Sequence, residues 1–323
     1  MERHLLLTMG GDGGESWNLR FVAGFFRCKT ALRLTLFYVV PDAYTAGLGE
    51  VILSDAQMRQ GMEQLARARR WAVEHGFAAE NVETRAVPRQ FGVVRDIVEE
   101  AHRGLYDAVV SGRRYLGWLE QTYTTSVSRG LLGEEIAFPL WVCHQPEPGL
   151  SGVLLCVDGS GENLRMADHV GFMLNTPGAE DHTVTLLHCR EPGREPGREL
   201  GREPGNGAGH GPDGACGDTS GHASGLGSCM SGEEAIAAAR EAVLANGVDE
   251  ARIRVLMVGG RDCTDRADKA ETILRVAERD RFAVVAVGRR TALPDTLMRR
   301  MFGRSVSERL HDRVNRFSLW VSK

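Results

Sequence analysis

The chain has 323 residues, of which 42% are hydrophobic and 25% are charged, and its formal net charge is −4. These values are typical of a soluble globular protein with enough length for two domains. The negative net charge provides no long-range attraction to nucleic acid or to an anionic membrane, and no apolar run approaches the roughly 18 residues of a membrane span. Seven irregularly spaced Cys argue against a disulfide framework, so we expect a cytoplasmic protein.

Short β-type runs alternate with helical runs along the first 147 residues, which predicts a parallel sheet covered by helices. The predicted strands are 5–9, 34–40, 82–87, 108–111 and 140–143, and the predicted helices are 16–27, 55–75, 93–104 and 125–132. Five strands with four interleaved helices indicate a doubly wound sheet, in which ligands bind at the carboxyl ends of the strands.

The same alternation returns in residues 151–323. Strands are predicted at 153–157, 183–188, 253–258, 283–287 and 319–321, and helices at 162–174, 232–246, 267–280 and 306–313. The sequence itself also repeats, because IVEEAHRGLYDAVVSGRR at 97–114 matches ILRVAERDRFAVVAVGRR at 273–290. A period this long indicates a duplicated globular domain rather than a solenoid. The predicted fold is therefore α/β, with two tandem doubly wound parallel five-stranded sheets in domains 1–147 and 151–323.

The loops after the first and fourth strands of the second copy carry a resemblance. Val157-Asp158-Gly159-Ser160 follows its first strand, and Gly288-Arg289-Arg290 follows its fourth strand, before a Gly303-Arg304-Ser305-Val306-Ser307 segment. This arrangement resembles the universal stress protein family, and the duplication resembles a tandem member of it. The resemblance implies an adenine nucleotide alpha-hydrolase-like fold and a glycine-rich loop that holds ATP phosphates in the nucleotide-binding members.

For this chain the resemblance implies a binding site in the second domain. It comprises Asp158, Gly159, Gly288, Arg289, Gly303, Ser305 and Ser307. Glycines suit such a loop because backbone N–H groups must approach phosphate closely. The first domain has Gly10 in place of the Asp, and Tyr115 and Thr125 in place of loop glycines, so we expect its nucleotide loop to be degenerate.

Other interpretations of these residues stay open. Asp158 can cap the following turn by accepting backbone N–H bonds. Arg289 and its neighbour Arg290 can form solvated or interdomain salt bridges instead of phosphate contacts. Arg299, Arg300 and Arg304 make the loop basic, which favours an anionic ligand without naming it.

Residues 190–231 form a Gly-rich insert that contains no periodic apolar pattern. We expect it to be disordered and dispensable for folding. His210, Cys216, His222 and Cys229 lie within it, but their spacings do not fit the short pairs of a zinc site. No metal is therefore expected.

No catalytic Ser/His/acid or Cys/His set is recognisable in a strand-end context. We expect a non-enzymatic stress-response or signalling protein, with ATP as its candidate ligand. The alternative is a weak ATPase or a nucleotide-dependent switch built on the second domain. The resemblance implies pairing through the last strands, and the apolar segments 139–143 and 318–322 suit it, so we expect them to pair antiparallel and join the two domains into an intrachain pseudo-dimer. A homodimer and an unidentified protein partner stay open; no nucleic acid or membrane partner is expected.

Overall fold

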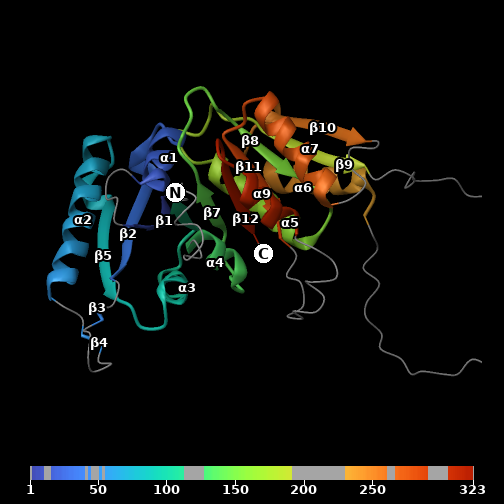
Figure 1. Cartoon of the computed structure of the whole chain (residues 1–323). Coiled ribbons are helices and arrows are strands. Elements are labelled where there is room, and N and C mark those ends of the chain that lie inside the picture. Colours follow the sequence, from blue (N-terminus) through green and yellow to red (C-terminus); the bar gives the residue numbers. More distant parts are fainter. Residues whose placement is uncertain are drawn as a thin grey trace, which may run out of the picture.

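The computed structural model describes residues 2–10, 16–40, 43–44, 51–52, 55–112, 127–190, 230–259, 266–289 and 305–322 (Figure 1). Gly303, Arg290, the loop 113–126 and residues 191–229 of the insert lie outside these ranges. None of the helices in the described ranges is long and apolar enough to cross a membrane.

The first half of the chain runs from β1 to β7. Its elements are β1 (Arg3–Thr8), α1 (Trp17–Phe25), β2 (Leu32–Val40), β3 (Ala43–Tyr44), β4 (Val51–Ile52), α2 (Asp55–Glu74), β5 (Val82–Pro88), α3 (Val93–Gly104), β6 (Ala108–Gly112), α4 (Val127–Gly133) and β7 (Leu140–Cys143). The 3₁₀ turns Lys29–Ala31 and Ala79–Asn81 precede β2 and β5.

The second half runs from β8 to β12. Its elements are β8 (Val153–Cys156), α5 (Gly161–Leu174), β9 (Val184–Arg190), α6 (Gly232–Ala245), β10 (Ile253–Gly259), α7 (Arg266–Arg279), β11 (Val284–Gly288), α9 (Val306–Arg313) and β12 (Ser318–Ser322). The 3₁₀ turn Glu250–Arg252 precedes β10, as Ala79–Asn81 precedes β5.

The predicted elements are all present, and their ends differ from the predicted ones by at most two residues. The short strands β3 and β4 were not predicted, because two residues are too few to establish a period of two. The helix ends repeat as well. Leu105 and Arg281 follow α3 and α7 at equivalent places in the two copies, and both have a positive φ, 49° and 57°. A left-handed residue of this kind is a common way to end a helix.

Ten strands form one continuous sheet in the order β10-β9-β8-β11-β12-β7-β6-β1-β2-β5. Within each half the order is that of a doubly wound sheet, because the third, second, first, fourth and fifth strands lie side by side and parallel. The halves meet at β7 and β12, which pair antiparallel with Trp141 opposite Trp320. The predicted strand pairing between the two copies is therefore confirmed.

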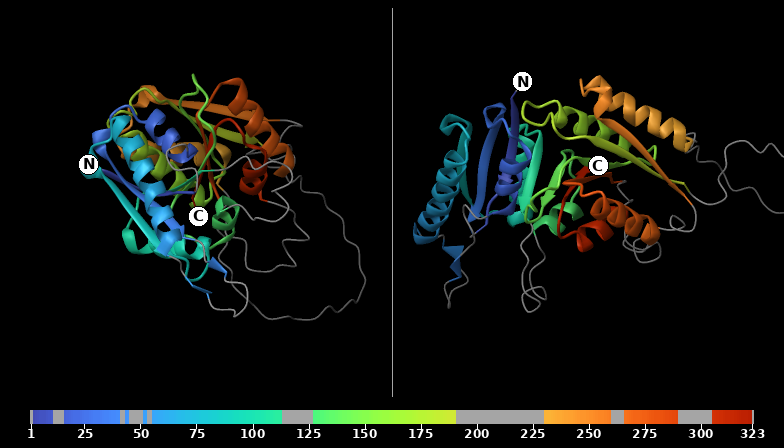
Figure 2. Two further views of the ribbon diagram at one scale, coloured as in Figure 1. Left: turned by 60° about the vertical axis from the view of Figure 1, so that its left-hand side comes forward. Right: turned by 90° about the horizontal axis from the view of Figure 1, so that it is seen from above.

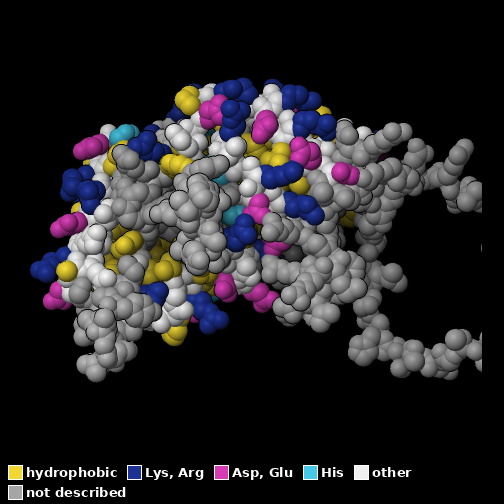
Figure 3. Space-filling model, in the orientation of Figure 1, with side chains coloured by type: hydrophobic (Ala, Val, Ile, Leu, Met, Phe, Trp, Pro, Cys, Tyr) yellow, Lys and Arg dark blue, Asp and Glu magenta, His cyan; other side chains and the backbone are white. Residues whose placement is uncertain are grey.

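Helices cover both faces of this sheet (Figure 2). Side chains of α1, α2, α5 and α6 contribute to one apolar core, and side chains of α3, α4, α7 and α9 contribute to the other. Central strands are buried on both faces, so β1 carries three consecutive Leu residues, 5 to 7, that have no exposed surface. Lys or Arg and Asp or Glu side chains are interspersed on the face shown in Figure 3.

The two tryptophans lie at the centre of the junction between the halves. Their rings stack with centroids 4.0 Å apart and an interplanar angle of 6°. Trp141 Nε1 donates a hydrogen bond to His169 Nε2 at 3.0 Å. Within the described residues, the buried Nε1 of Trp320 has no acceptor. The junction is therefore symmetric in its backbone and asymmetric in its hydrogen bonds.

Candidate functional site

The turn after β8 is held by its own side chains. Asp158 Oδ1 accepts hydrogen bonds from the backbone N–H of Ser160 at 2.9 Å and from its Oγ at 2.6 Å. Ser160 in turn caps α5, because its Oγ accepts from Asn163 N at 3.3 Å. Asp158 therefore has the turn-capping role that the sequence left open, while its carboxylate stays exposed to solvent.

Gly159 is required by this turn for two reasons. Its φ is +76°, a conformation that L side chains rarely adopt. A Cβ at this position would also lie 3.2 Å from Ala235 Cβ and 3.3 Å from Met230 Cβ, at the start of α6. The turn after β8 therefore packs against α6 as well as leading into α5.

Gly288 ends β11 directly against the first turn of α5. A Cβ on Gly288 would lie 2.4 Å from Asn163 N, 2.6 Å from Asn163 Cα and 2.6 Å from the carbonyl carbon of Glu162. All three are backbone atoms, which cannot move aside as a flexible side chain would. The absence of a side chain at Gly288 therefore allows the end of β11 and the start of α5 to lie in contact, independently of any role in ligand binding.

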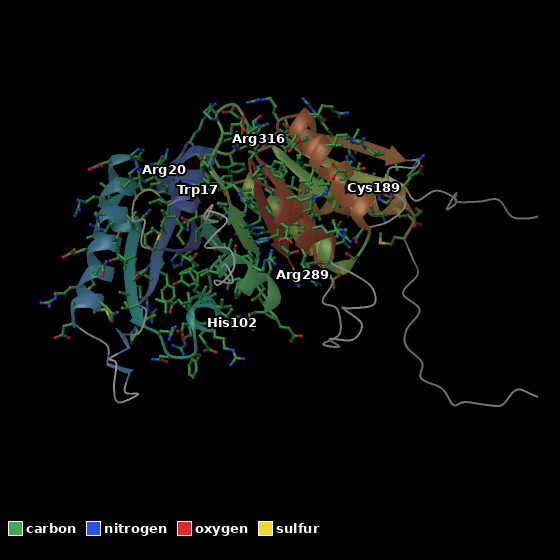
Figure 4. The ribbon with its side chains drawn as sticks, viewed as in Figure 1. Trp17, Arg20, His102, Cys189, Arg289 and Arg316 are labelled. Atoms are coloured by element: carbon green, nitrogen blue, oxygen red, sulfur yellow. The ribbon has the colours of Figure 1, made fainter. Side chains whose placement is uncertain are left out.

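Arg289 follows Gly288 and is labelled in Figure 4. Its backbone N–H donates to Ser322 O at 2.7 Å, which ties it to the end of β12. Its side chain is only 10% exposed and its Nη2 lies 3.4 Å from Glu308 Oε1. This guanidinium therefore forms the contact between the end of β11 and α9.

The start of α9 is a capping box. Ser305 Oγ accepts from Glu308 N at 3.3 Å, and Glu308 Oε2 accepts from Ser305 N at 3.1 Å. Ser307 is 3% exposed, and its Oγ lies 3.1 Å from Ser305 Oγ. A helix N-terminus favours an anion, and here the Glu308 carboxylate occupies that position.

The structure places the described members of the predicted site in one region. Asp158 and Gly159 precede α5, Gly288 contacts the start of α5, and Arg289 reaches Glu308 of the capping box that also contains Ser305. Gly303 lies outside the described residues, as do Arg290, Arg299, Arg300 and Arg304.

The sequence reasoning missed an asparagine that recurs at the start of the first helix of each half. Asn18 Nδ2 donates to Thr8 O at 2.8 Å and to Val110 O at 3.0 Å, at the carboxyl ends of β1 and β6. Asn163 Nδ2 donates to Cys156 O at the end of β8. Both asparagines begin an Asn-Leu-Arg triplet, at 18–20 and 163–165, and this repeat was the available signal.

Thiols and histidines also lie beneath the turn after β8. Burial, with smaller effects of Cys189 and Asp158, raises the pKa of Cys156 well above its usual value, so its thiol stays protonated. His188 Nδ1 lies 2.8 Å from Val157 O. Among the described residues, no group of three or more His, Cys, Asp or Glu side chains is arranged to hold a metal ion. The His and Cys residues of the insert at 210, 216, 222 and 229 lie outside that set.

A Ser, a His and an Asp do come together, between α4 and α9. Ser128 Oγ lies 3.1 Å from His311 Nε2, and His311 Nδ1 lies 3.3 Å from Asp312 Oδ1. Ser128 is 1% exposed and His311 is 2% exposed, so a substrate cannot reach the hydroxyl in this arrangement. Arg129 forms an ion pair with Asp312 beside them. This group therefore connects the two halves on the sheet face opposite α1 and α5.

The fold of this chain matches that of several solved structures. Neither a protein-family model nor a curated protein matches the sequence. Among solved structures, a universal stress protein from Archaeoglobus fulgidus DSM 4304 matches with a TM-score of 0.61 and 17% identity, over 99% of this chain and 96% of that one. A putative universal stress protein from Pseudomonas aeruginosa UCBPP-PA14 matches with a TM-score of 0.52 and 17% identity, over 100% and 93% of the two chains.

A functionally unknown protein from Pseudomonas aeruginosa PAO1 matches similarly, with a TM-score of 0.53 and 16% identity over 100% of this chain and 92% of that one. These matches span both halves of the chain. The chain therefore has the fold of a tandem universal stress protein.

Proposed function

We propose that the chain is a non-enzymatic stress-response or signalling protein of tandem universal stress type that binds an adenine nucleotide in its second domain, residues 151–323. The observation that carries this proposal is that Asp158 follows β8, Arg289 follows β11, and Arg289 contacts the first turn of α9, which Ser305 caps. This edge of a doubly wound sheet, between its first and fourth strands, is where ligands bind. The first domain, residues 1–147, has Gly10 at the place of Asp158.

The ribose side of this site is assigned to Asp158. Its Oδ1 already accepts two hydrogen bonds from Ser160, which fixes the orientation of the carboxylate. The second carboxylate oxygen of this exposed side chain is then available to accept from a ribose hydroxyl. Gly159 keeps the backbone beside it free of a side chain.

The phosphate side is assigned to Arg289 and to the N-terminus of α9. The helix dipole and the N–H groups of the first turn favour an anion there, and the guanidinium adds a full positive charge. A bound phosphate takes over the N–H of Ser305, which Glu308 now occupies, while the Glu308 carboxylate remains beside Arg289. Ligand binding therefore changes the contacts at the start of α9.

The first test is to purify the full chain without added nucleotide, denature it and identify any released adenine nucleotide by chromatography. Calorimetric titration with ATP then compares the wild type with Asp158→Ala and Ser305→Gly. We expect each variant to weaken binding at least tenfold, because Asp158→Ala removes the acceptor for the ribose and Ser305→Gly removes the hydroxyl beside the phosphate. Gly at a helix N-cap lowers stability by only about 0.3 kcal/mol, so the start of α9 should stay folded. Gly288→Val is unsuitable, because its side chain would collide with the backbone of Asn163.

The matched control is Ser16→Gly at the start of α1 in the first half, where the hydroxyl makes no capping bond. ATP binding should be unchanged in this variant. Absence of nucleotide from the purified protein, together with no heat of binding at millimolar ATP, would remove the proposal. Release of labelled phosphate from ATP, abolished by Ser305→Gly, would instead favour the ATPase or switch function.

A further inference from the structure

A polar cluster around one buried carboxylate lies in the first half, between β5, α3 and the start of β6. It consists of Arg85, Glu100 and Tyr106. Arg85 Nη1 donates to Glu100 Oε1 at 2.6 Å, and Tyr106 Oη donates to the same oxygen at 3.0 Å. The Glu100 side chain is only 3% exposed. Within the described residues, no hydrogen bond is made to the other carboxylate oxygen, Oε2.

The equivalent positions of the second half carry no charged side chains. Val82 of β5 and Ile253 of β10 hold equivalent registers, opposite Leu34 and Val184, so Arg85 corresponds to Leu256 three residues further on. The repeat that aligns 97–114 with 273–290 makes Glu100 correspond to Val276, and Tyr106 to Phe282.

The three counterparts, Leu256, Val276 and Phe282, all pack into the apolar core of the second half. Replacing a buried ion pair with well-packed apolar side chains is often neutral or stabilising. The second half demonstrates that this arrangement of strands and helices folds with apolar residues at all three places. The polar cluster of the first half is therefore not needed for the fold, which points to a ligand.

A surface depression opens beside the cluster, next to α3, the helix that carries the labelled His102 in Figure 4. Arg85 and Glu100 line it together with the apolar side chains Phe37, Val87, Pro88 and Phe91. Phe91 is 67% exposed at its rim.

The loop that carries Phe91 is fixed by Asp96. The two carboxylate oxygens of Asp96 accept from Gln90 N at 2.9 Å and from Phe91 N at 3.0 Å. The negative charge of Asp96 is therefore used by the loop. Glu99 and Arg103, also in the lining, pair with each other at 3.3 Å. The groups left for a ligand are Glu100 Oε2, the remaining N–H groups of Arg85, the side chain of Gln90 and the apolar surface.

Those groups define the chemistry of the ligand. A carboxylate oxygen to which no described residue donates, Glu100 Oε2, takes an ammonium group. The Arg85 side chain is 49% exposed and takes a carboxylate. Because Arg85 and Glu100 are themselves in contact, the two ligand charges must be carried on neighbouring atoms. We propose that this pocket binds a free α-amino acid with an apolar side chain, which packs against Phe91 and Val87.

The experiment is calorimetric titration of the full chain with L-leucine and L-phenylalanine. Two analogues dissect the ligand: 4-methylpentanoate lacks the ammonium group, and 3-methylbutylamine lacks the carboxylate. We expect one amino acid to bind per chain, and each analogue to bind at least tenfold more weakly. An amine that binds as tightly as the amino acid would overturn the role of Arg85.

The decisive variant copies the second half into the first: Arg85→Leu, Glu100→Val and Tyr106→Phe together. It should unfold at the same temperature as the wild type or higher, and amino-acid affinity should fall at least 100-fold. Glu100→Gln is the second variant. It keeps an acceptor for Arg85 and Tyr106, and it should weaken binding at least tenfold whether or not the triple variant folds.

The matched control is Glu83→Gln on the same strand, which removes the exposed ion pair with Arg33. It should leave amino-acid affinity unchanged. The proposal is overturned if none of the twenty amino acids binds the wild type at millimolar concentration. It is equally overturned if Glu100→Gln binds as tightly as the wild type does.

Discussion

The two halves of the molecule share one strand order, but they differ in the distance between the start of the first helix and the end of the fourth strand. A Cβ at Gly112 would lie 3.4 Å from its nearest neighbour, Asn18 N, whereas one at Gly288 would lie 2.4 Å from Asn163 N. The halves also differ at their shared junction, where Trp141 has an acceptor and, in the described part of the chain, Trp320 has none. The duplication therefore keeps the backbone arrangement and lets the local contacts diverge.

The largest expected difference between the halves is in tolerance of a methyl group at the end of the fourth strand. The methyl group of Gly288→Ala would push the backbone of the first turn of α5 away from the end of β11. We therefore expect this variant to lower the free energy of unfolding by about 3 kcal/mol. Gly112→Ala places its methyl group at an ordinary contact distance and should change stability by no more than about 0.5 kcal/mol. Urea unfolding of both variants measures the difference, and equal effects would show that the closer contact in the second half is not a constraint.

The next expected difference concerns the stacked tryptophans. Trp141→Phe leaves the buried Nε2 of His169 without its donor, and we expect it to lower the free energy of unfolding by about 2 kcal/mol more than Trp320→Phe does. Trp320→Phe removes a donor that has no acceptor within the described residues, so its effect should be limited to lost ring area. The comparison is made by urea unfolding at neutral pH.

A double-mutant cycle sharpens this comparison. With His169→Leu as background, Trp141→Phe no longer leaves an acceptor unpaired, so the gap between the two tryptophan variants should close. A gap that persists in this background would assign the asymmetry to packing instead of to the hydrogen bond.

The third expected effect is a pH dependence that arises at the tryptophan junction. Burial, reinforced by the nearby positive charge of Arg3, lowers the pKa of His169 to about 3. The His169 ring lies against both stacked tryptophans, with centroids 5.8 Å from Trp141 and 5.8 Å from Trp320, and Phe25 of the first half lies 5.6 Å from Trp320. Phe25 does not titrate.

The direction of this effect follows from proton binding. Between the usual pKa of His, about 6.5, and the folded value, the unfolded chain binds a proton that the folded chain does not, so stability falls as pH falls. His169 should contribute a loss of about 1.4 kcal/mol for each pH unit in this window. Urea unfolding at pH 6 and pH 5 measures the slope, which His169→Gln should reduce. An unchanged slope in that variant would show that His169 is not the titrating group.

Sequence patterns predicted the arrangement of this molecule well, for physical reasons. Parallel strands buried on both faces are continuous apolar runs, and the duplication supplied each pattern twice. The pairing of β7 with β12 followed because an apolar edge strand needs a partner. The turn residues after β8 and β11 lie at one edge of the sheet, since the ends of parallel strands meet there.

Contacts between separate elements were not predictable in the same way. The ion pair of Arg289 with Glu308 joins a strand end to a helix, and nothing in the local pattern of either segment specifies the other. The polar cluster could not be predicted for a related reason. Glu100 lies in a helix with many charged residues, so its sequence context predicts an exposed side chain. Only a position-by-position comparison with Val276 of the second copy, combined with burial, separates it from a surface glutamate.

The smallest expected effect concerns the insert, which has no counterpart of similar length in the first half. Arg190 Nη2 at the end of β9 and Glu233 Oε1 in the first turn of α6 lie 3.8 Å apart, so the side chains of the described residues on either side of 191–229 reach each other. Ser231, at the end of the predicted insert, and Glu234 start α6 with a capping box that needs no residue from 191–229. Replacing 191–229 with about 12 Gly and Ser residues shortens the loop by less than two doublings of length, so the free energy of unfolding should change by at most about 1 kcal/mol.

Thermal unfolding of the replacement variant measures this change. The control is a Ser231→Ala variant, which should lose about 1 kcal/mol because it removes the cap of α6. A loss on replacement larger than that of Ser231→Ala would show that the insert stabilises the second half, and the expectation that it is dispensable for folding would then be wrong.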